Sequence, residues 1–270
     1  MAKEVKVIVL RTAGTNCDAE TAFAFHSCGA QVESVHINQL FQGKAHLRDY
    51  HILAVPGGFT YGDDIESGRL LANELRLRLG DHLQQFITDG KLIIGICNGF
   101  QVLVKAGLLP GPLTEEESQK DNLGQTATLV SNDSGKFEAR WVHLKAGGKS
   151  IWTEGLEDIV YYPVAHAEGK FVPGNEAVLE RLKQNGQVAF RYCTRGGERG
   201  VYPENPNGSA DDIAGITDTT GRLLGLMPHP ERHFLFRQHP FWTRLPGGGR
   251  HGQGARIFNN GVNYVEKNLL

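Results

Sequence analysis

One cysteine stands where its thiol could act as a nucleophile. Cys97 follows an apolar run, residues 92–96, and precedes Asn98, Gly99 and a second apolar stretch. A buried strand that turns sharply into a helix would present the thiol at the bend, as hydrolases present a serine. The N-terminus of that helix would favour thiolate over thiol. A small core residue is the simpler reading of a lone cysteine, so a partner base is needed to support this chemistry.

A histidine and a glutamate two positions apart could supply that base. His229 lies between two prolines after the apolar run 223–227, and Glu231 follows it. In an extended segment both side chains would point to one face, so the carboxylate could orient the imidazole. Cys97 as nucleophile, His229 as base and Glu231 as orienting group could together perform acyl transfer through a thioester. The alternative is a turn histidine beside a surface glutamate, since the chain has 11 histidines.

Paired glycines could complete such a site. Gly57 and Gly58 follow the apolar run 52–55 and Pro56. Glycines at the end of a strand leave backbone N–H groups open to a ligand, as an oxyanion hole requires. The N–H group of Asn98, next to the thiol, could be a second donor. The alternative is an ordinary turn after a strand.

The order of elements in the first half of the chain predicts a parallel sheet. Apolar strands alternate with helical segments, and two helices end at glycines in the usual cap position. This alternation is typical of an α/β fold whose central, mostly parallel sheet is covered by helices on both faces. The predicted strands are residues 5–10, 31–37, 52–55 and 92–96, and the predicted helices are 19–28, 69–88 and 100–106.

The second half of the chain contains short strand candidates separated by turn residues. Their close spacing predicts that the sheet continues as a mixed sheet with antiparallel additions. A last helix is expected over residues 256–269, and no linker divides the chain, so we expect one domain spanning 1–270. The strand candidates are 125–129, 137–144, 159–164, 188–192, 213–217 and 223–227; the expected loops are 110–122, 195–209 and 246–254, the last a flexible connection.

Composition restricts the classes of protein that fit. The chain has 270 residues, of which 40% are hydrophobic and 21% charged, as is ordinary for a globular protein. A net charge of −2 gives no general reason to expect nucleic acid binding. No apolar run approaches the roughly 20 residues that span a bilayer. Because the 4 cysteines are widely spaced and form no CxxC pair, we expect a cytoplasmic protein with reduced thiols and no metal site.

The motifs, in their order along the chain, resemble those of the class I (triad) glutamine amidotransferases. Within that class they are most similar to the glutaminase (PurQ-type) subunits of phosphoribosylformylglycinamidine synthase. The resemblance runs from the first strand to about Arg232. It is carried by residues 57–63, 96–101, 163–171, 207–209, 212–216 and 227–232.

The resemblance implies a flavodoxin-like fold and a glutaminase that works through a cysteine thioester. It also assigns roles to residues of this chain. The implied catalytic triad is Cys97, His229 and Glu231; the implied oxyanion and substrate contacts are Gly57, Gly58, Asn98 and Gln101; and a substrate or partner loop would hold His166 and Glu168.

The resemblance further implies partners. Ammonia from L-glutamine would pass to a synthetase (PurL-type) subunit, accompanied by a small PurS-type subunit. That synthetase would convert formylglycinamide ribonucleotide to formylglycinamidine ribonucleotide in de novo purine biosynthesis. ATP and Mg are expected on the synthetase and no cofactor on this chain, which has no Walker loop. The alternatives are a glutaminase of another amidotransferase complex, a different cysteine hydrolase on the same fold, and a regulatory subunit without activity.

Some features depart from the family pattern. Glu66 and Ser67 stand where the family commonly has an Arg-Cys pair, and Ala167 stands where glycine is more usual. An insert around residues 195–205 and the tail beyond Arg232 are longer than expected for a bacterial subunit. These departures leave the triad intact, so we expect any difference in function on the partner-facing surface and the substrate side.

Overall fold

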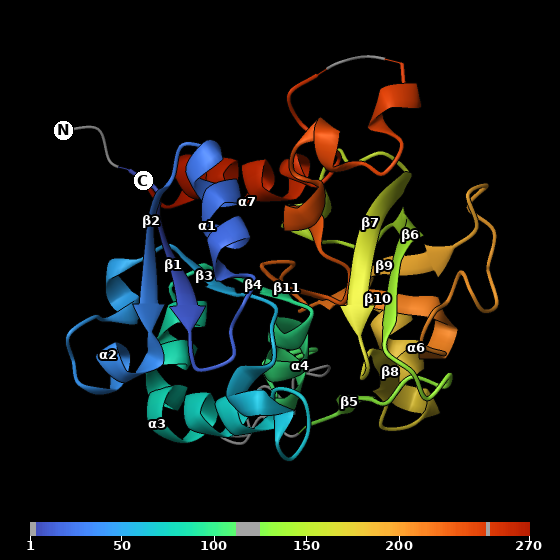
Figure 1. Ribbon diagram of the computed structural model, residues 1–270. Helices are drawn as coiled ribbons and strands as arrows, with labels where there is room; N and C mark the ends of the chain where they lie inside the picture. Colours follow the sequence, from blue (N-terminus) through green and yellow to red (C-terminus); the bar gives the residue numbers. More distant parts are fainter. Residues whose placement is uncertain (1–3, 112–124, 247–248) are drawn as a thin grey trace.

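The computed structural model of the chain describes residues 4–111, 125–246 and 249–270. At its centre is a single nine-stranded sheet (Figure 1). Its strands are β1 (Lys6–Arg11), β2 (Gln31–His36), β3 (Ile52–Val55), β4 (Leu92–Ile96), β6 (Glu138–Ala146), β7 (Ile159–His166), β9 (Val188–Cys193), β10 (Ile213–Thr217) and β11 (Leu223–Leu226).

The strand order is β2-β1-β3-β4-β11-β10-β9-β6-β7. Neighbouring strands are parallel from β2 to β11 and antiparallel from β11 to β7. The order 2-1-3-4 followed by a further parallel strand is that of flavodoxin-like folds. The predicted α/β class, with a parallel sheet and antiparallel additions, is therefore confirmed.

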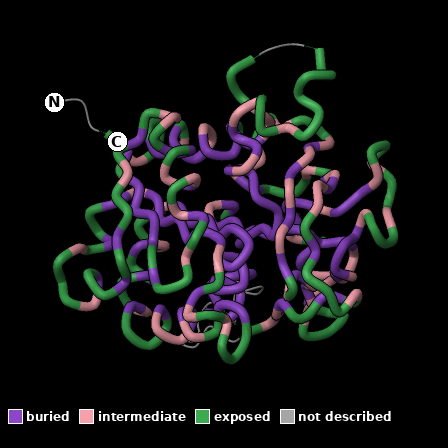
Figure 2. The backbone as a smooth tube through the Cα atoms, in the orientation of Figure 1, coloured by how far each residue is buried: buried purple, intermediate pink, exposed green. Residues whose placement is uncertain are grey.

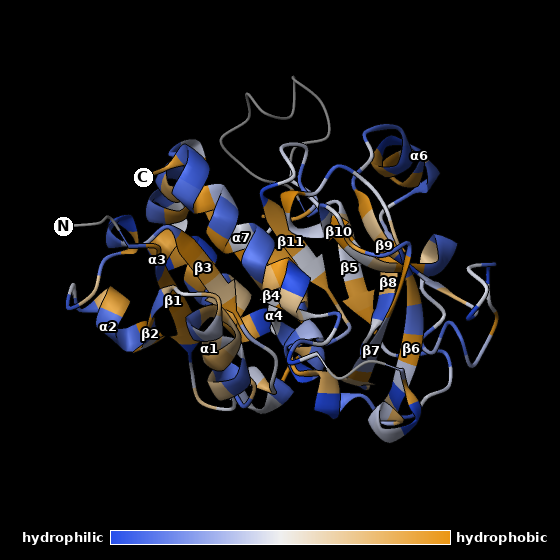
Figure 3. Cartoon of the chain, turned by 90° about the horizontal axis from the view of Figure 1, so that it is seen from above, coloured by the Kyte–Doolittle hydropathy of each residue, from blue (hydrophilic) through white to orange (hydrophobic). Residues whose placement is uncertain are grey.

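Helices cover both faces of the parallel strands (Figure 1). The helices α1 (Asp18–Ser27) and α7 (Ala255–Asn268) lie on one face, and α3 (Arg69–Thr88) and α4 (Asn98–Lys105) lie on the other. Strands β3, β4 and β11 are buried along their whole length, as expected of strands covered on both sides (Figure 2). In Figure 3 these strands are mostly hydrophobic, whereas the helices alternate hydrophilic and hydrophobic residues.

A second, two-stranded sheet lies beside α4. It pairs β5 (Ala127–Val130) with β8 (Lys170–Pro173). The prediction that residues 125–129 extend the main sheet is therefore wrong. The Phe171 ring stacks on the Phe100 ring of α4 at a centroid distance of 6.3 Å, so the small sheet is held by packing on a helix.

Two helices lack a prediction from the sequence: α2 (Ile37–Phe41) and α6 (Glu176–Gln184). The start of α6 has a clear signal, because the Asn175 side chain accepts a hydrogen bond from the Val178 N–H group at 3.0 Å. Short 3-10 helices are η1 (Leu47–Asp49), η2 (Thr60–Asp63), η3 (Ile151–Thr153), η4 (Ala210–Asp212), η5 (Pro230–His233), η6 (Phe236–Gln238) and η7 (Trp242–Arg244).

The remaining boundaries differ from the predictions by a few residues, and three differences concern function. Helix α4 begins at Asn98, two residues earlier than predicted, directly after Cys97. Residues 230–233 form a 3-10 helix, so the prediction of an extended segment there is wrong. The predicted loop 110–122 lies almost entirely outside the described residues.

Part of the glycine-rich segment 246–254 is held by contacts with the rest of the chain. Gly252 donates its N–H group to the Phe234 carbonyl at 2.8 Å, and Gly254 donates to the His233 carbonyl at 3.0 Å. A Cβ atom on Gly254 would lie 1.9 Å from the Pro230 carbonyl oxygen, so the backbone packs directly on η5. The expectation of a flexible connection is wrong for residues 252–254.

The buried apolar side chains form one cluster that extends from β1 to α7. The single-domain assignment stays a prediction. In the described part of the chain, no helix combines the length and the apolar character needed to cross a bilayer.

Candidate active site

Neighbouring parallel strands end at one place. The loop after β1 carries Cys17, the loop after β3 carries Gly57 and Gly58, β4 runs into Cys97, and β11 leads to His229. In open α/β sheets, ligand sites lie at the carboxyl ends of the strands. The topology therefore gathers residues from four distant segments of the chain.

The Cys97 backbone has the strained geometry of a nucleophile elbow. Its φ is 52° and its ψ is −106°, a conformation that non-glycine residues rarely adopt. The elbow fits because the neighbouring glycines let the backbones touch. A Cβ atom on Gly99 would lie 1.8 Å from the Val55 carbonyl oxygen, and one on Gly95 would lie 2.6 Å from the Gly99 carbonyl oxygen. The strand-turn-helix expected around Cys97 is present.

The imidazole and carboxylate of the predicted triad are in direct contact. The Nδ1 atom of His229 lies 2.6 Å from Oε1 of Glu231, and both residues are buried. The 3-10 turn starting at Pro230 returns Glu231 to the ring, so this contact forms without the predicted extended segment. The backbone N–H group of His229 donates to the Pro163 carbonyl at 2.8 Å, which fixes the histidine against β7.

The surroundings of His229 favour its protonated ring. Burial alone lowers the pKa of His229, but the Glu231 carboxylate and the sulfur groups of Cys97 and Cys17 outweigh burial and raise this pKa well above 6.5. Among the described residues, Nε2 of His229 has no hydrogen-bond partner. The Cys97 Sγ contacts the Ala165 carbonyl oxygen at 3.6 Å. An imidazolium beside a cysteine stabilises the thiolate form that attacks carbonyl carbons.

A second thiol, absent from the sequence-based assignment, faces the same imidazole. Cys17 is 1% exposed, and its Sγ donates to Oδ1 of Asn16 at 3.1 Å and accepts from Nη2 of Arg232 at 3.0 Å. Burial raises the pKa of Cys17, although His229 and Arg232 partly oppose this rise. The only signal in the sequence is its position after the first strand, which becomes informative once the strand order is known.

The paired glycines line the space beside the elbow. A Cβ atom on Gly57 would lie 2.8 Å from Cε1 of His229, 3.1 Å from Sγ of Cys17 and 3.4 Å from Cβ of Cys97, so no side chain fits there. The Gly58 N–H group makes no hydrogen bond to any described residue. Asn98 is the first residue of α4, where N–H groups lack partners within the helix. Both N–H groups could donate to a bound oxyanion, and this role stays a prediction.

A chain of side-chain hydrogen bonds ties the glycine loop to α4 and to the end of β7. The Asn98 Oδ1 accepts from the Thr60 N–H group at 3.2 Å, and its Nδ2 donates to Oε1 of Gln101 at 3.0 Å. The Gln101 Nε2 donates to the Glu168 carbonyl at 2.5 Å. Both the oxygen and the nitrogen of the buried Gln101 amide are thus hydrogen-bonded within the protein, and we call this link the Gln101–Glu168 brace. The predicted contact of Gln101 with substrate stays a prediction.

His166 and Glu168 also lie close to the site, where they make contacts within the protein. The Nδ1 atom of His166 lies 3.1 Å from Oδ1 of Asn132, and burial lowers the pKa of His166 to about 4, so its ring is neutral. The Glu168 carboxylate accepts from the Ser67 N–H group at 3.2 Å and lies 3.9 Å from Nζ of Lys105. Their role toward substrate or partner stays a prediction.

Cys17, His229 and Glu231 are the one group among the described residues whose ligand atoms could surround a metal ion, all lying within 4.8 Å of one another. The imidazole and the carboxylate of this group are already bonded to each other. The arrangement therefore fits an oriented base beside thiols better than an open coordination site.

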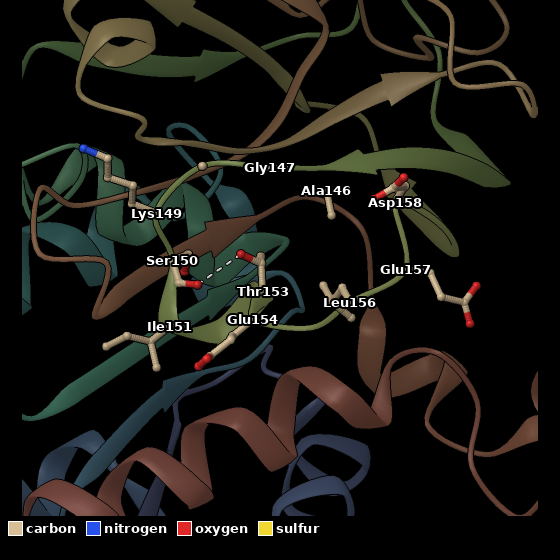
Figure 4. Close-up of a pocket in the computed structure, with 11 residues that line it drawn as sticks. Ala146, Gly147, Lys149, Ser150, Ile151, Thr153, Glu154, Leu156, Glu157 and Asp158 are labelled. Carbon is tan, nitrogen blue, oxygen red and sulfur yellow. Dashed lines mark hydrogen bonds between the residues drawn. The ribbon is translucent and has the colours of Figure 1, made fainter.

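A separate cavity of about 360 Å³ is lined by the segment that connects β6 to β7 along the chain (Figure 4). Residues 146–151, 153, 154 and 156–158 line it, and the Thr153 hydroxyl donates to the Ser150 carbonyl inside it. No triad residue contributes to this cavity.

Comparison with known proteins identifies the family. The profile of the CobB/CobQ-like glutamine amidotransferase domain matches residues 4–265. The curated phosphoribosylformylglycinamidine synthase subunit PurQ of Dehalococcoides mccartyi is 46% identical over 267 residues, covering 98% of this chain and 99% of that protein. The chain belongs to the PurQ family of glutamine amidotransferases. The resemblance found in the sequence motifs is thereby confirmed.

Other PurQ relatives agree. The PurQ subunit of Archaeoglobus fulgidus is 43% identical over 281 aligned positions, which cover 98% of each chain. Among solved structures, PurLQS from Thermotoga maritima matches with a TM-score of 0.72 at 27% identity, covering 97% of this chain and 100% of that one. A glutamine amidotransferase from Thermotoga maritima, with a TM-score of 0.51 at 15% identity, shares the PurQ fold.

Proposed function

We propose that the chain is the glutaminase subunit of phosphoribosylformylglycinamidine synthase. It hydrolyses L-glutamine to glutamate and ammonia and delivers the ammonia to a synthetase. One observation carries this proposal: a strained Cys97 elbow stands beside a buried His229–Glu231 pair whose bonded atoms are 2.6 Å apart, in a chain of the PurQ family.

The reaction follows from the placement of these groups. The Cys97 thiolate attacks the side-chain amide carbon of glutamine, and the N–H groups of Gly58 and Asn98 stabilise the oxyanion. The His229 imidazolium gives a proton to the leaving nitrogen, and ammonia departs from a glutamyl thioester. The neutral imidazole then takes a proton from water, which attacks the thioester and releases glutamate. The Glu231 carboxylate holds the ring in position through both steps.

The ammonia needs a receiving enzyme, because protonation in bulk water would remove its nucleophilic lone pair. The PurQ relatives are named as subunits of a synthase, and the PurLQS structure contains such a chain. We assign this chain a PurL-type synthetase, with a small PurS-type subunit, as partners. ATP and Mg bind the synthetase, which forms formylglycinamidine ribonucleotide. The 4 cysteines are free, which suits a cytoplasmic enzyme.

Replacement of the nucleophile tests the proposal. In a complex reconstituted with the synthetase and the small subunit, Cys97→Ser should reduce glutamine-dependent product formation more than about 1,000-fold. Activity with added ammonium should remain, because the synthetase is untouched. Cys28→Ser, which changes a partly buried thiol at the end of α1, serves as the matched control.

Equal loss of glutamine-dependent and ammonium-dependent activity in Cys97→Ser would refute the nucleophile assignment. Complementation of a purine auxotroph lacking its own glutaminase subunit distinguishes this complex from other amidotransferases. Failure of the wild-type chain to restore growth together with its synthetase would refute the assignment to purine biosynthesis.

A further inference from the structure

A second cavity has no residue of the triad in its lining. It encloses about 930 Å³, within the range of about 300–1,000 Å³ that is usual for small-molecule sites. Its walls come from the start of β7, from residues 155–157 and from the tail after Arg232. Neither Cys97 nor His229 lines it, so the proposed glutaminase reaction does not account for this cavity.

Three arginines surround this cavity. Arg195, Arg244 and Arg256 line it, and we call them the arginine rim. Among the described residues none of the three has a carboxylate partner, and Arg256 donates only to the Glu154 carbonyl at 3.3 Å. The one acidic lining residue, Glu157, already accepts a hydrogen bond from Gln253 at 2.7 Å. Guanidinium groups that line one space and have no carboxylate partner suit a phosphate group.

Four aromatic rings also line this cavity and contact one another in series. We call His143, Tyr161, His239 and Phe241 the aromatic wall. The Tyr161 ring lies 4.4 Å from the His143 ring and 5.4 Å from the His239 ring, measured between centroids. Phe241 continues the series at 6.1 Å from His239 and is 52% exposed. Such a wall can stack against a planar base.

Two segments that contribute nothing to the triad meet at this cavity. Arg195 lies in the insert, and Arg244, His239 and Phe241 lie in the tail, which runs beside the start of β7 (Figure 1). Neither segment contributes a group to the triad or to the oxyanion site. The glutaminase reaction therefore gives no reason for these two segments to line the same cavity.

We propose that this cavity binds a mononucleotide. The arginine rim holds the phosphate, and the aromatic wall stacks against the base. A mononucleotide fits better than either part alone. A sugar phosphate would not contact the aromatic wall, and a nucleoside would not contact the arginine rim.

Binding to the full-length chain tests the proposal directly. In calorimetric titrations, AMP should bind at one site per chain, and adenosine and ribose 5-phosphate should each bind at least about tenfold more weakly. No saturable AMP binding, or AMP binding no tighter than that of ribose 5-phosphate or inorganic phosphate, would overturn the proposal.

Variants locate the site. Arg244→Ala should weaken AMP binding about tenfold, and Phe241→Ala about fivefold or more. Both side chains are exposed, so the fold should be retained, as circular dichroism would check. Arg76→Ala is the matched control, since Arg76 is an exposed arginine of α3 with no ion pair among the described residues. Equal AMP affinity in wild type and Arg244→Ala would overturn the assignment.

Discussion

At the scale of single residues, the surroundings of the His229 ring are asymmetric. Its Nδ1 is bonded to the Glu231 carboxylate, whereas its Nε2 is open and has two thiols nearby. Both thiols stand directly before a helix, but only Cys97 has the strained backbone of an elbow, whereas Cys17 is held by Asn16 and Arg232. This difference in backbone geometry favours Cys97 as the proposed nucleophile.

Cys17→Ala should shift the pH dependence of glutamine hydrolysis without abolishing it. Cys17 is one of the groups that raise the pKa of His229, so its removal should lower that pKa. The limb of the kcat/KM profile that reports His229 should then move to lower pH. Measured profiles of wild type, Cys17→Ala and the control Cys193→Ala would show the shift. If Cys17→Ala were as inactive as Cys97→Ala, Cys17 rather than its neighbour would be the candidate nucleophile.

Gly57→Ala should reduce glutaminase activity at least about 100-fold while the chain still folds. The added methyl group would lie 2.8 Å from Cε1 of His229 and would displace the ring from its working position. Gly80→Ala in α3 is the control, because a Cβ atom there meets nothing within 4 Å and alanine favours a helix. Steady-state kinetics and thermal unfolding of both variants check the prediction; near-normal turnover by Gly57→Ala would contradict the tight fit.

At the scale of elements, the end of β7 should make stability sensitive to acid. Burial lowers the pKa of His166 to about 4, from an ordinary value of 6.5. As the pH falls below 6.5, the unfolded chain binds this proton and the native chain does not, so stability present above pH 6.5 is lost toward pH 4. The loss from this group approaches about 3 kcal/mol.

His166→Asn should flatten that part of the stability profile, because the asparagine amide can still donate to Asn132 but does not titrate. Urea unfolding of wild type and variant at pH 7, 5.5 and 4.5 provides the measurement. The difference between the two should change with pH in this window. A constant difference would show that His166 keeps an ordinary pKa in the folded chain.

The sequence predicts those elements whose signals are local. The apolar run into Cys97 and the helix with regularly spaced leucines over residues 69–88 need no information from elsewhere in the chain. The pairing of β5 with β8 is different, because nothing in two four-residue strands specifies the partner. Helix α6 lies between these cases: Asn175 and the spacing of Val178 and Leu182 indicate it.

The same distinction applies to the site. Cys97, His229 and Glu231 could be chosen from motifs, and the structure brings His229 and Glu231 together through a 3-10 turn that the motif did not reveal. Cys17 could not be chosen, because a cysteine in a polar turn has no local pattern. Its place beside His229 results from the position of β1 next to β3 in the sheet.

At the scale of the whole molecule, we expect the isolated chain to be a slow glutaminase that assembly accelerates. The Nε2 atom of His229 has no hydrogen-bond partner in the described structure. Gln101 is bonded to the Glu168 carbonyl, in the loop that we expect to contact substrate or partner. We expect docking of the synthetase to move this loop and to bring the catalytic groups into their working arrangement. Glutaminase rates of the chain alone and with its synthetase test this; an equal rate in both would contradict dependence on assembly.

The proposed reacting groups lie where the parallel part of the sheet faces strand β7. The parallel half supplies Cys97 and His229, and the far edge strand β7 supplies the carbonyl oxygens of Pro163 and Ala165 that contact them. A small opening between these halves would misalign the thiol and imidazole while each half kept its own core. Mild denaturant should therefore abolish glutaminase activity at concentrations that leave the circular dichroism unchanged. A ligand that bridges the two halves should preserve turnover at higher denaturant concentrations, with a smaller effect on the unfolding transition.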